Sequence, residues 1–242
     1  MESVSAPSAP MRPIPSVLIV GVGSGLGTSL ARVFKAAGYR LALAARHPQR
    51  LASLAQELDA SAWACDASDP RQVDALFEQF DRTFGAAPDV VIYNPSARVR
   101  GAITEVDPHA VAQALDVCAF GGFLVAQQAA RRMLARRKGA LLFTGASASV
   151  KGYAQSAAFA MGKFALRGLA QSLARELAPQ GIHVAHVVID GAIRSADRPA
   201  TPDAPDALLD PEAIARSYLQ LVEQPRNAWT WELELRPWVE RF

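Results

Sequence analysis

Lys163 lies four residues after an aromatic residue in the stretch "SAAFAMGKFAL" (156–166). This is the spacing of a catalytic Tyr-x-x-x-Lys pair, in which the tyrosine hydroxyl moves a proton and the lysine assists it. The aromatic residue here is Phe159, whose ring has no hydroxyl. If the rest of the chain indicates an oxidoreductase, another group has to carry the proton.

A glycine-rich loop, "GVGSGLG" (21–27), follows an apolar run at 17–20 and opens a helical pattern. Glycines permit a tight turn and let backbone N–H groups approach phosphates, while the helix dipole favours negative charge. Placement in the first strand-turn-helix unit favours a dinucleotide site over a purely structural turn. From this loop we expect cofactor contacts by Gly21, Ser24, Gly25, Leu26 and Gly27.

The end of the second predicted strand (40–45) bears on which cofactor is used. An acidic residue there would bind the ribose 2′-hydroxyl of NAD. The strand instead ends "AARHPQR", in which Arg46 offers a cation for a 2′-phosphate. The sequence therefore predicts NADP, with NAD as the less favoured cofactor; the alternative is that Arg46 stacks on adenine or faces solvent.

Composition narrows the class of protein. The 242 residues are 50% hydrophobic and 20% charged, and 25 basic against 23 acidic residues give a net charge of +2. No long basic stripe predicts a nucleic acid or an anionic membrane as partner. The two cysteines, Cys65 and Cys118, form no disulfide framework, and no run approaches the roughly 18 apolar residues that span a bilayer. We expect a cytoplasmic protein that acts on a small molecule.

Short apolar runs alternate with helical patterns, which predicts an α/β fold: a single Rossmann-like, doubly wound domain over 16–242. Residues 1–15, with four prolines, are expected to be a flexible leader. The expected sheet has seven parallel strands flanked by helices. Its strands are expected at 17–20, 40–45, 61–65, 90–94, 140–145, 183–189 and 229–235. The helices include a long one across 110–137 and one from the Lys163 region to about Leu177.

Two further features of the sequence bear on the site: a loop whose role stays open, and a pair of histidines that does not form a metal site. The Pro-, Asp- and Ala-rich segment between Ser195 and Asp210 reads as a long surface loop, either a lid over a site or a variable connection. His183 and His186 are three residues apart on one predicted strand, so they point to opposite faces and cannot share a metal. No metal site is expected.

From the glycine spacing onward the chain resembles the short-chain dehydrogenase/reductase family, over nearly all of Val17–Leu235. "CDASD" (65–69) resembles the family's strand-end aspartate, implying that Asp66 contacts adenine. "YNPSA" (93–97) resembles its Asn-Ala-Gly turn and retains Asn94. Lys163 matches the motif lysine. "IDGAI" (189–193) stands where the family has Pro-Gly, with Asp190 in the place of the proline and Ile193 as a cofactor contact.

The resemblance also shows where the chain departs from the family. An ungapped alignment puts Ala146 at the position of the family's serine, Phe159 at that of its tyrosine and Cys118 at that of its asparagine, so only Lys163 of the tetrad remains. Loss of a positioned acid costs about 10²–10⁴ in rate. The candidate substitutes are Ser147 and Tyr153, with Ser149 and Ser156 nearby.

Two functions remain open. One is an NADP-dependent oxidoreductase that acts on a small carbonyl or alcohol through an altered proton relay. The other is a catalytically impaired dinucleotide-binding protein with a sensing or assembly role. In either case the resemblance implies a homodimer or homotetramer, formed through the helix at 110–137 and the helix that carries Lys163.

Overall fold

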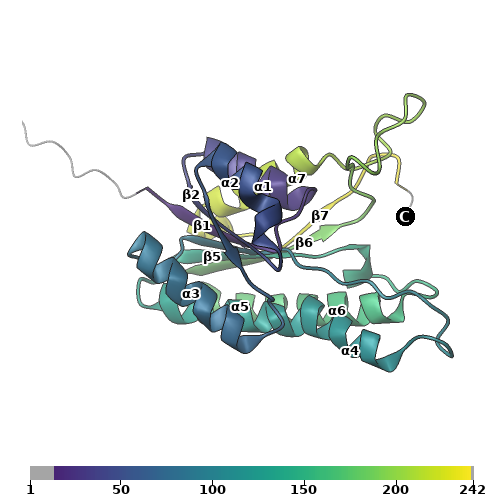
Figure 1. Ribbon diagram of the computed structural model, residues 1–242, viewed down its shortest axis with the longest axis horizontal. Coiled ribbons are helices and arrows are strands. Elements are labelled where there is room, and N and C mark those ends of the chain that lie inside the picture. Colours follow the sequence, from purple (N-terminus) through teal and green to yellow (C-terminus); the bar gives the residue numbers. More distant parts are fainter. Residues whose placement is uncertain (1–13, 241–242) are drawn as a thin grey trace, which may run out of the picture.

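The computed structural model describes residues 14–240. The predicted leader, residues 1–15, lies outside this range except for its last two residues. The described residues hold a central sheet between two layers of helices (Figure 1). This is the α/β, Rossmann-like fold that the sequence predicts.

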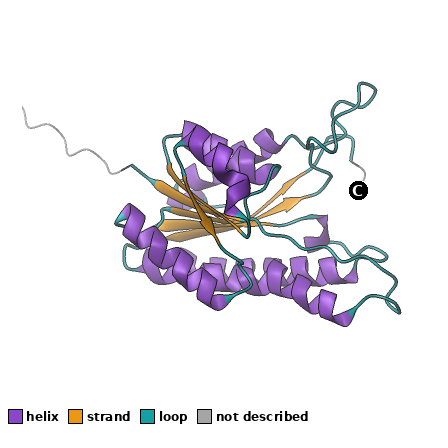
Figure 2. Cartoon of the chain, in the orientation of Figure 1, coloured by secondary structure: helices purple, strands orange, loops and turns teal. Residues whose placement is uncertain are grey.

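The sheet has seven parallel strands in the order β3-β2-β1-β4-β5-β6-β7. Figure 2 shows the strands together between the helices of the two layers. Strand order therefore reverses between β1 and β4, which is where a doubly wound sheet opens a crevice at the carboxyl ends of its strands. The strands are β1 (Ser16–Val20), β2 (Arg40–Ala45), β3 (Ser61–Ala64), β4 (Val90–Tyr93), β5 (Gly139–Thr144), β6 (Ile182–Ile189) and β7 (Glu232–Leu235).

Alternate residues of the strands build two separate apolar cores. Ile19 packs with Phe34 on one face of the sheet, while its neighbour Leu18 packs with Phe80 on the other, because successive strand side chains point to opposite faces. Helices α1 (Leu26–Ala36), α2 (Ala52–Leu58) and α7 (Pro211–Glu223) cover the first face. The other face is covered by α3 (Pro70–Phe84), α4 (Pro108–Leu115), α5 (Gly121–Leu134) and α6 (Ala157–Leu177).

The structure corrects the sequence analysis in three elements. The helix expected as continuous across 110–137 is divided: α4 and α5 are joined by a π-helical turn, Asp116–Phe120, which carries the buried Cys118. Helix α7 lies in a stretch to which the sequence analysis assigns no element. Strand β7 begins three residues later than expected, because Trp229 and Thr230 are hydrogen-bonded to Gln224 in the preceding turn.

The helical segment Pro108–Leu134 is, among the described residues, the one long and apolar enough to cross a bilayer by length and composition. Its inner face packs into the fold: Val125, Ala126 and Ala129 are buried in the core, and a Cβ atom on Gly121 would clash with Tyr93 and Ala67. The apolar composition therefore serves the packing of α5 against the sheet.

Candidate active site

Two adjoining hollows lie at the carboxyl edge of the sheet. The outer cleft, about 840 Å³, runs from the glycine loop across the ends of β2 and β3. The inner cavity, about 730 Å³, lies between the ends of β4, β5 and β6 and the start of α6. Asn94 and Ser96 line both hollows, so they meet at the reversal point of the sheet.

The glycine loop has the shape that a phosphate site needs. Gly21 has φ +84°, and a Cβ atom there would lie 2.6 Å from the backbone nitrogen of Pro95. A Cβ on Gly27 would lie 2.8 Å from the Cα of Val22, so this glycine packs behind the loop. Gly23 and Gly25 instead border open space, where a ligand has room to approach their backbone.

The structure distributes the predicted cofactor residues over connected surfaces. Gly21, Ser24, Arg46, Asp66 and Asn94 line the outer cleft. Leu26, Asn94, Lys163 and Ile193 line the inner cavity. Gly25 borders an adjacent groove together with Ser24, which also lines the outer cleft. The geometry therefore brings all the predicted residues except the packed Gly27 along one path.

Asn94 fastens the two halves of this path. Its backbone N–H donates to the Val20 carbonyl, and its side-chain amide donates to the Gly21 carbonyl, both at 2.9 Å. The end of β4 and the first glycine of the loop are thereby held together.

The far end of the outer cleft is cationic. Arg46, His47 and Arg50 line it, and Arg46 is exposed at the end of β2. The carboxylate of Glu57 also lines the cleft but is held by two hydrogen bonds from Arg32, at 2.8 and 2.9 Å. The arginine predicted to read a 2′-phosphate thus faces the cleft.

Lys163 lies at the inner cavity with 1% of its surface exposed. Its Nζ donates to the Thr144 carbonyl at 2.8 Å, which ties α6 to the end of β5. Burial lowers the pKa of Lys163 to about 8, because desolvation disfavours the charged amine. A polar ligand that accepts a hydrogen bond from the ammonium group would therefore stabilise the charged form of this lysine.

Phe159 lies one helical turn before Lys163 and lines the same cavity. The guanidinium carbon of Arg98 is 4.5 Å from the centre of its ring, a cation–π contact. Ala146 also lines the cavity. The thiol of Cys118 faces the backbone of Ala97, with its Sγ 3.3 Å from the amide nitrogen and 3.4 Å from the carbonyl oxygen.

Of the candidate hydroxyls, Ser147, Tyr153 and Ser156 line the inner cavity with Lys163. Tyr153 is ten residues before the lysine, and the loop before α6 folds back to bring it there, with half of its surface exposed. Ser156 precedes the first residue of α6, and its side chain makes no capping hydrogen bond.

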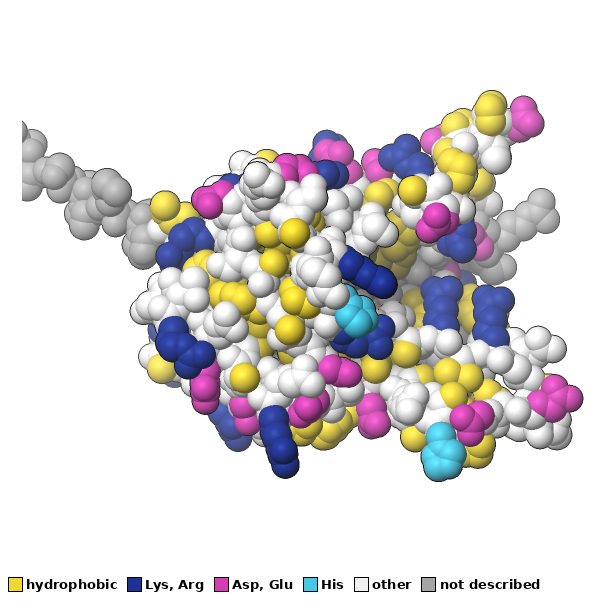
Figure 3. Space-filling view, in the orientation of Figure 1, with side chains coloured by type: hydrophobic (Ala, Val, Ile, Leu, Met, Phe, Trp, Pro, Cys, Tyr) yellow, Lys and Arg dark blue, Asp and Glu magenta, His cyan; other side chains and the backbone are white. Residues whose placement is uncertain are grey.

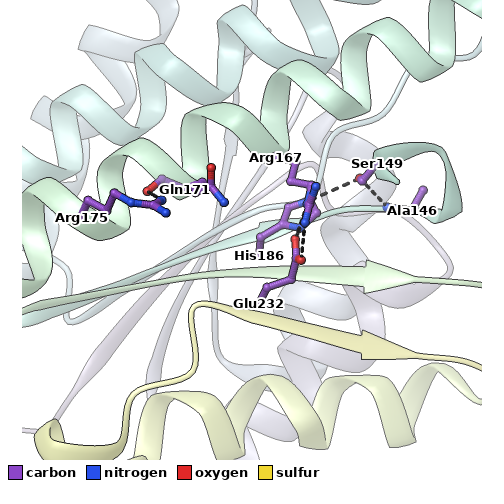
Figure 4. A network of polar contacts seen from close by, with 7 residues as sticks. All are labelled: Ala146, Ser149, Arg167, Gln171, Arg175, His186 and Glu232. Carbon is purple, nitrogen blue, oxygen red and sulfur yellow. Dashed lines mark hydrogen bonds and ion pairs between the residues drawn. The ribbon is translucent and has the colours of Figure 1, made fainter. Parts of the chain in front are cut away.

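Ser149 belongs instead to a buried network that links three elements (Figure 4). His186 on β6 contacts the Ser149 hydroxyl through Nε2 at 3.3 Å and Glu232 on β7 through Nδ1 at 3.1 Å. Burial lowers the pKa of His186 to about 4, so the ring is neutral. Arg167 on α6 holds Glu232 through two hydrogen bonds, at 2.6 and 2.7 Å.

The hydrogen-bonded series Ser149, His186 and Glu232 resembles a nucleophilic triad. The burial of the serine and the histidine, however, argues for a structural role. Ser149 and His186 have no exposed surface, and the Ser149 oxygen accepts a hydrogen bond from the Ala146 N–H at 3.2 Å. A serine that no substrate can reach cannot act as a nucleophile. The network therefore fixes the turn after β5, which forms one wall of the inner cavity.

Asp190 is a second buried anchor that sequence reasoning left without a role. It is 2% exposed, and its carboxylate lies 2.8 Å from the Lys151 amine and 3.5 Å from the Arg236 guanidinium. Burial raises the pKa of this carboxyl, but hydrogen bonds from Lys151 and Ser147 outweigh that effect and hold the pKa below its usual range. The Lys151–Asp190 ion pair tethers the loop that carries Tyr153. The sequence signal for this anchor was a charged residue directly after the run "HVVI".

Within residues 14–240, no group of three His, Cys, Asp or Glu side chains is placed so that it could hold a metal ion.

A doubly wound sheet with a glycine loop after β1 defines a dinucleotide-binding fold of the Rossmann type. A model of the short chain dehydrogenase family matches residues 15–199, and the chain belongs to this family of oxidoreductases. A short-chain dehydrogenase from Rhodopseudomonas palustris is 35% identical, with a TM-score of 0.82 over 93% of this chain and 99% of its own.

A curated relative and a further solved structure are also similar to this chain. An uncharacterized oxidoreductase of Staphylococcus aureus (strain N315) is 27% identical over 226 residues, which are 91% of this chain and 96% of the relative. A metagenomic short-chain oxidoreductase, solved in complex with NADP, shares the fold with a TM-score of 0.81 and 24% identity, over 92% of this chain and 97% of its own.

Proposed function

We propose that this protein is an NADP-dependent oxidoreductase that interconverts a carbonyl and an alcohol on a small molecule. The observation that carries the proposal is the continuity of the outer cleft and the inner cavity through Asn94 and Ser96, with Arg46 at one end and Lys163 at the other. A dinucleotide phosphorylated on its adenosine ribose would have its 2′-phosphate at Arg46, its pyrophosphate at the glycine loop and its nicotinamide end near Lys163. Bound there, it supplies a hydride.

The proton on the substrate oxygen requires a group of the protein. By the resemblance, Phe159 and Ala146 stand where the family has its tyrosine and serine, and neither can transfer a proton. Tyr153 and Ser147 line the same cavity. Because Ser147 is hydrogen-bonded to the Asp190 carboxylate, we assign the proton transfer to Tyr153, with Lys163 holding the bound dinucleotide.

The test combines cofactor binding with steady-state rates over a panel of small carbonyls. Native protein is expected to bind NADPH and oxidise it with at least one carbonyl. Tyr153→Phe should lower kcat about 10²-fold or more, because it removes only the hydroxyl. The matched change Tyr39→Phe, directly before β2 and outside both hollows, also removes one hydroxyl and should leave the rate unchanged. An unchanged rate in Tyr153→Phe would remove this residue from the relay.

The double change Phe159→Tyr with Ala146→Ser distinguishes an altered relay from a lost one. If Tyr153 carries the proton, the double variant should leave the native reaction flat or slower, because the Phe159 ring shapes the cavity under Arg98. A native protein that binds NADPH, reduces nothing, and gains about 10²-fold activity on mutation would instead support a dinucleotide-binding protein that has lost turnover.

A further inference from the structure

The charged side chains that line the inner cavity are all positive. They are Arg98, Arg100, Lys163 and Arg198, and no Asp or Glu lines it with them. The space-filling view shows Lys and Arg side chains gathered along the hollow between the two helix layers (Figure 3). The net charge of the whole chain is only +2, so this concentration of one sign is local.

The three arginines converge from distant parts of the sequence. Arg98 and Arg100 follow β4, and Arg198 lies a hundred residues later in the loop after β6. Burial, together with the charges of Arg100 and Arg198, lowers the pKa of Arg98. All three side chains nevertheless keep exposed surface, so an anion from solvent reaches them and offsets the repulsion among their charges.

Several other arginines in the described chain are held by carboxylates. Arg132 lies 2.7 Å from Asp81, Arg167 lies 2.6 Å from Glu232 and Arg194 lies 2.8 Å from Asp210. Within residues 14–240 no carboxylate pairs with Arg98, Arg100 or Arg198. The guanidinium of Arg98 instead packs over the Phe159 ring. This contact leaves the N–H groups of Arg98 for a ligand.

These arginines are separate from the groups that would hold the cofactor's phosphates. The glycine loop and Arg46 line the outer cleft, whereas the three arginines line the inner cavity beside Lys163 and Tyr153. An anion held here would therefore lie next to the reacting carbonyl and not at the adenosine end.

We propose that the substrate is a carbonyl compound that carries an anionic group, a carboxylate or a phosphate, bound by Arg98 and Arg100 and covered by Arg198. In this arrangement Phe159 has a function of its own, because its ring holds the guanidinium of Arg98 at the cavity wall. Arginine suits this task because its planar fork matches both anions with two parallel hydrogen bonds. The inference rests on the proposed oxidoreductase function and adds its substrate class.

The experiment compares matched carbonyls that differ in charge. One pair is acetoacetate and its methyl ester; the other is dihydroxyacetone phosphate and dihydroxyacetone. In native protein with NADPH, kcat/KM for the anion of at least one pair should exceed that for the neutral partner by about tenfold or more, and the ratio should fall as salt is added. The pair that shows the preference identifies the anion as carboxylate or phosphate.

Variants locate the preference. Arg98→Gln, Arg100→Gln and Arg198→Gln should each lower the ratio of anion to neutral partner several-fold, and Arg98→Lys should retain part of it. Arg216→Gln, on the outer side of α7 and paired with Glu212, is the matched control that should leave the ratio unchanged. Equal kcat/KM within both pairs would overturn the proposal.

Calorimetric titration of the same four compounds into the NADPH-loaded protein separates the two levels of inference. If no compound is reduced but an anion binds at least tenfold more tightly than its neutral partner, and Arg98→Gln abolishes the difference, the anion site stands and the oxidoreductase function falls. If neither anion binds more tightly than its partner, the anion site falls whatever the activity.

Discussion

Arg46 is the residue on which the choice between the two nicotinamide cofactors depends. Its side chain lies at the cationic end of the outer cleft. Arg46→Asp should weaken NADPH binding about 10- to 100-fold and NADH binding far less, because it replaces a charge-assisted hydrogen bond with repulsion against the 2′-phosphate. Dissociation constants measured by fluorescence titration test this. Equal weakening of both cofactors would count against NADP.

The positions of single residues were predictable where they depend on a local motif. The sequence predicts the glycine loop after β1, and the resemblance assigns Asn94 and Lys163, because each motif belongs to its own strand end or helix turn. Arg98 and Arg198 were not predictable, since only the folded chain brings them to one cavity, and no spacing records a contact across a hundred residues. Tyr153 lay between these cases, as a candidate whose loop geometry the sequence left open.

At the scale of elements, the network of Ser149, His186 and Glu232 should make stability depend on pH. His186 has a pKa of about 4 in the fold against 6.5 ordinarily. Its contribution is therefore complete above pH 6.5 and is lost as pH falls toward 4, since the unfolded chain takes up the proton first. Between pH 7 and 5 the loss is about 2 kcal/mol.

Urea unfolding of native protein and of His186→Gln at several pH values measures this loss. The variant should be less stable at pH 7, and its stability should fall less steeply between pH 6.5 and 5. Burial also lowers the pKa of His183, so its protonation on acidification would destabilise the fold in the same direction, and His183→Gln serves as the comparison. An identical slope in native protein and His186→Gln would show that His186 does not carry the effect.

Most elements followed from apolar periodicity, and the exceptions have physical reasons. Val73, Leu76, Phe77 and Phe80 recur at helical spacing in the sequence of α3, and all four are buried. A π-helical turn keeps nearly the same spacing of apolar residues as the helices around it, so the division between α4 and α5 left no signal. The start of β7 was misplaced because Trp229 and Thr230 continue an alternating pattern while serving a turn.

For the whole molecule, the predicted homodimer or homotetramer has a candidate surface on the outer side of the α5 and α6 layer. Phe120, Phe123, Met161 and Phe164 are each between 42% and 51% exposed there, and the rings of Phe120 and Phe123 stack. Charged substitutions, Phe123→Asp with Phe164→Asp, should shift the mass in analytical ultracentrifugation toward the monomer. A native monomer, or an unchanged oligomer in the variant, would contradict this prediction.

The interior place of β1, between β2 and β4, also governs how the chain reaches its fold. One of its neighbours, β4, is distant in sequence: Ser16 and Asp89, which are hydrogen-bonded, are 73 residues apart. Until β4 arrives, an apolar strand with an open hydrogen-bonding edge is exposed to other chains. The chain loses the conformational entropy of closing this long loop before the contact between β1 and β4 stabilises it. Refolding should therefore be slow, and its yield should fall as protein concentration rises.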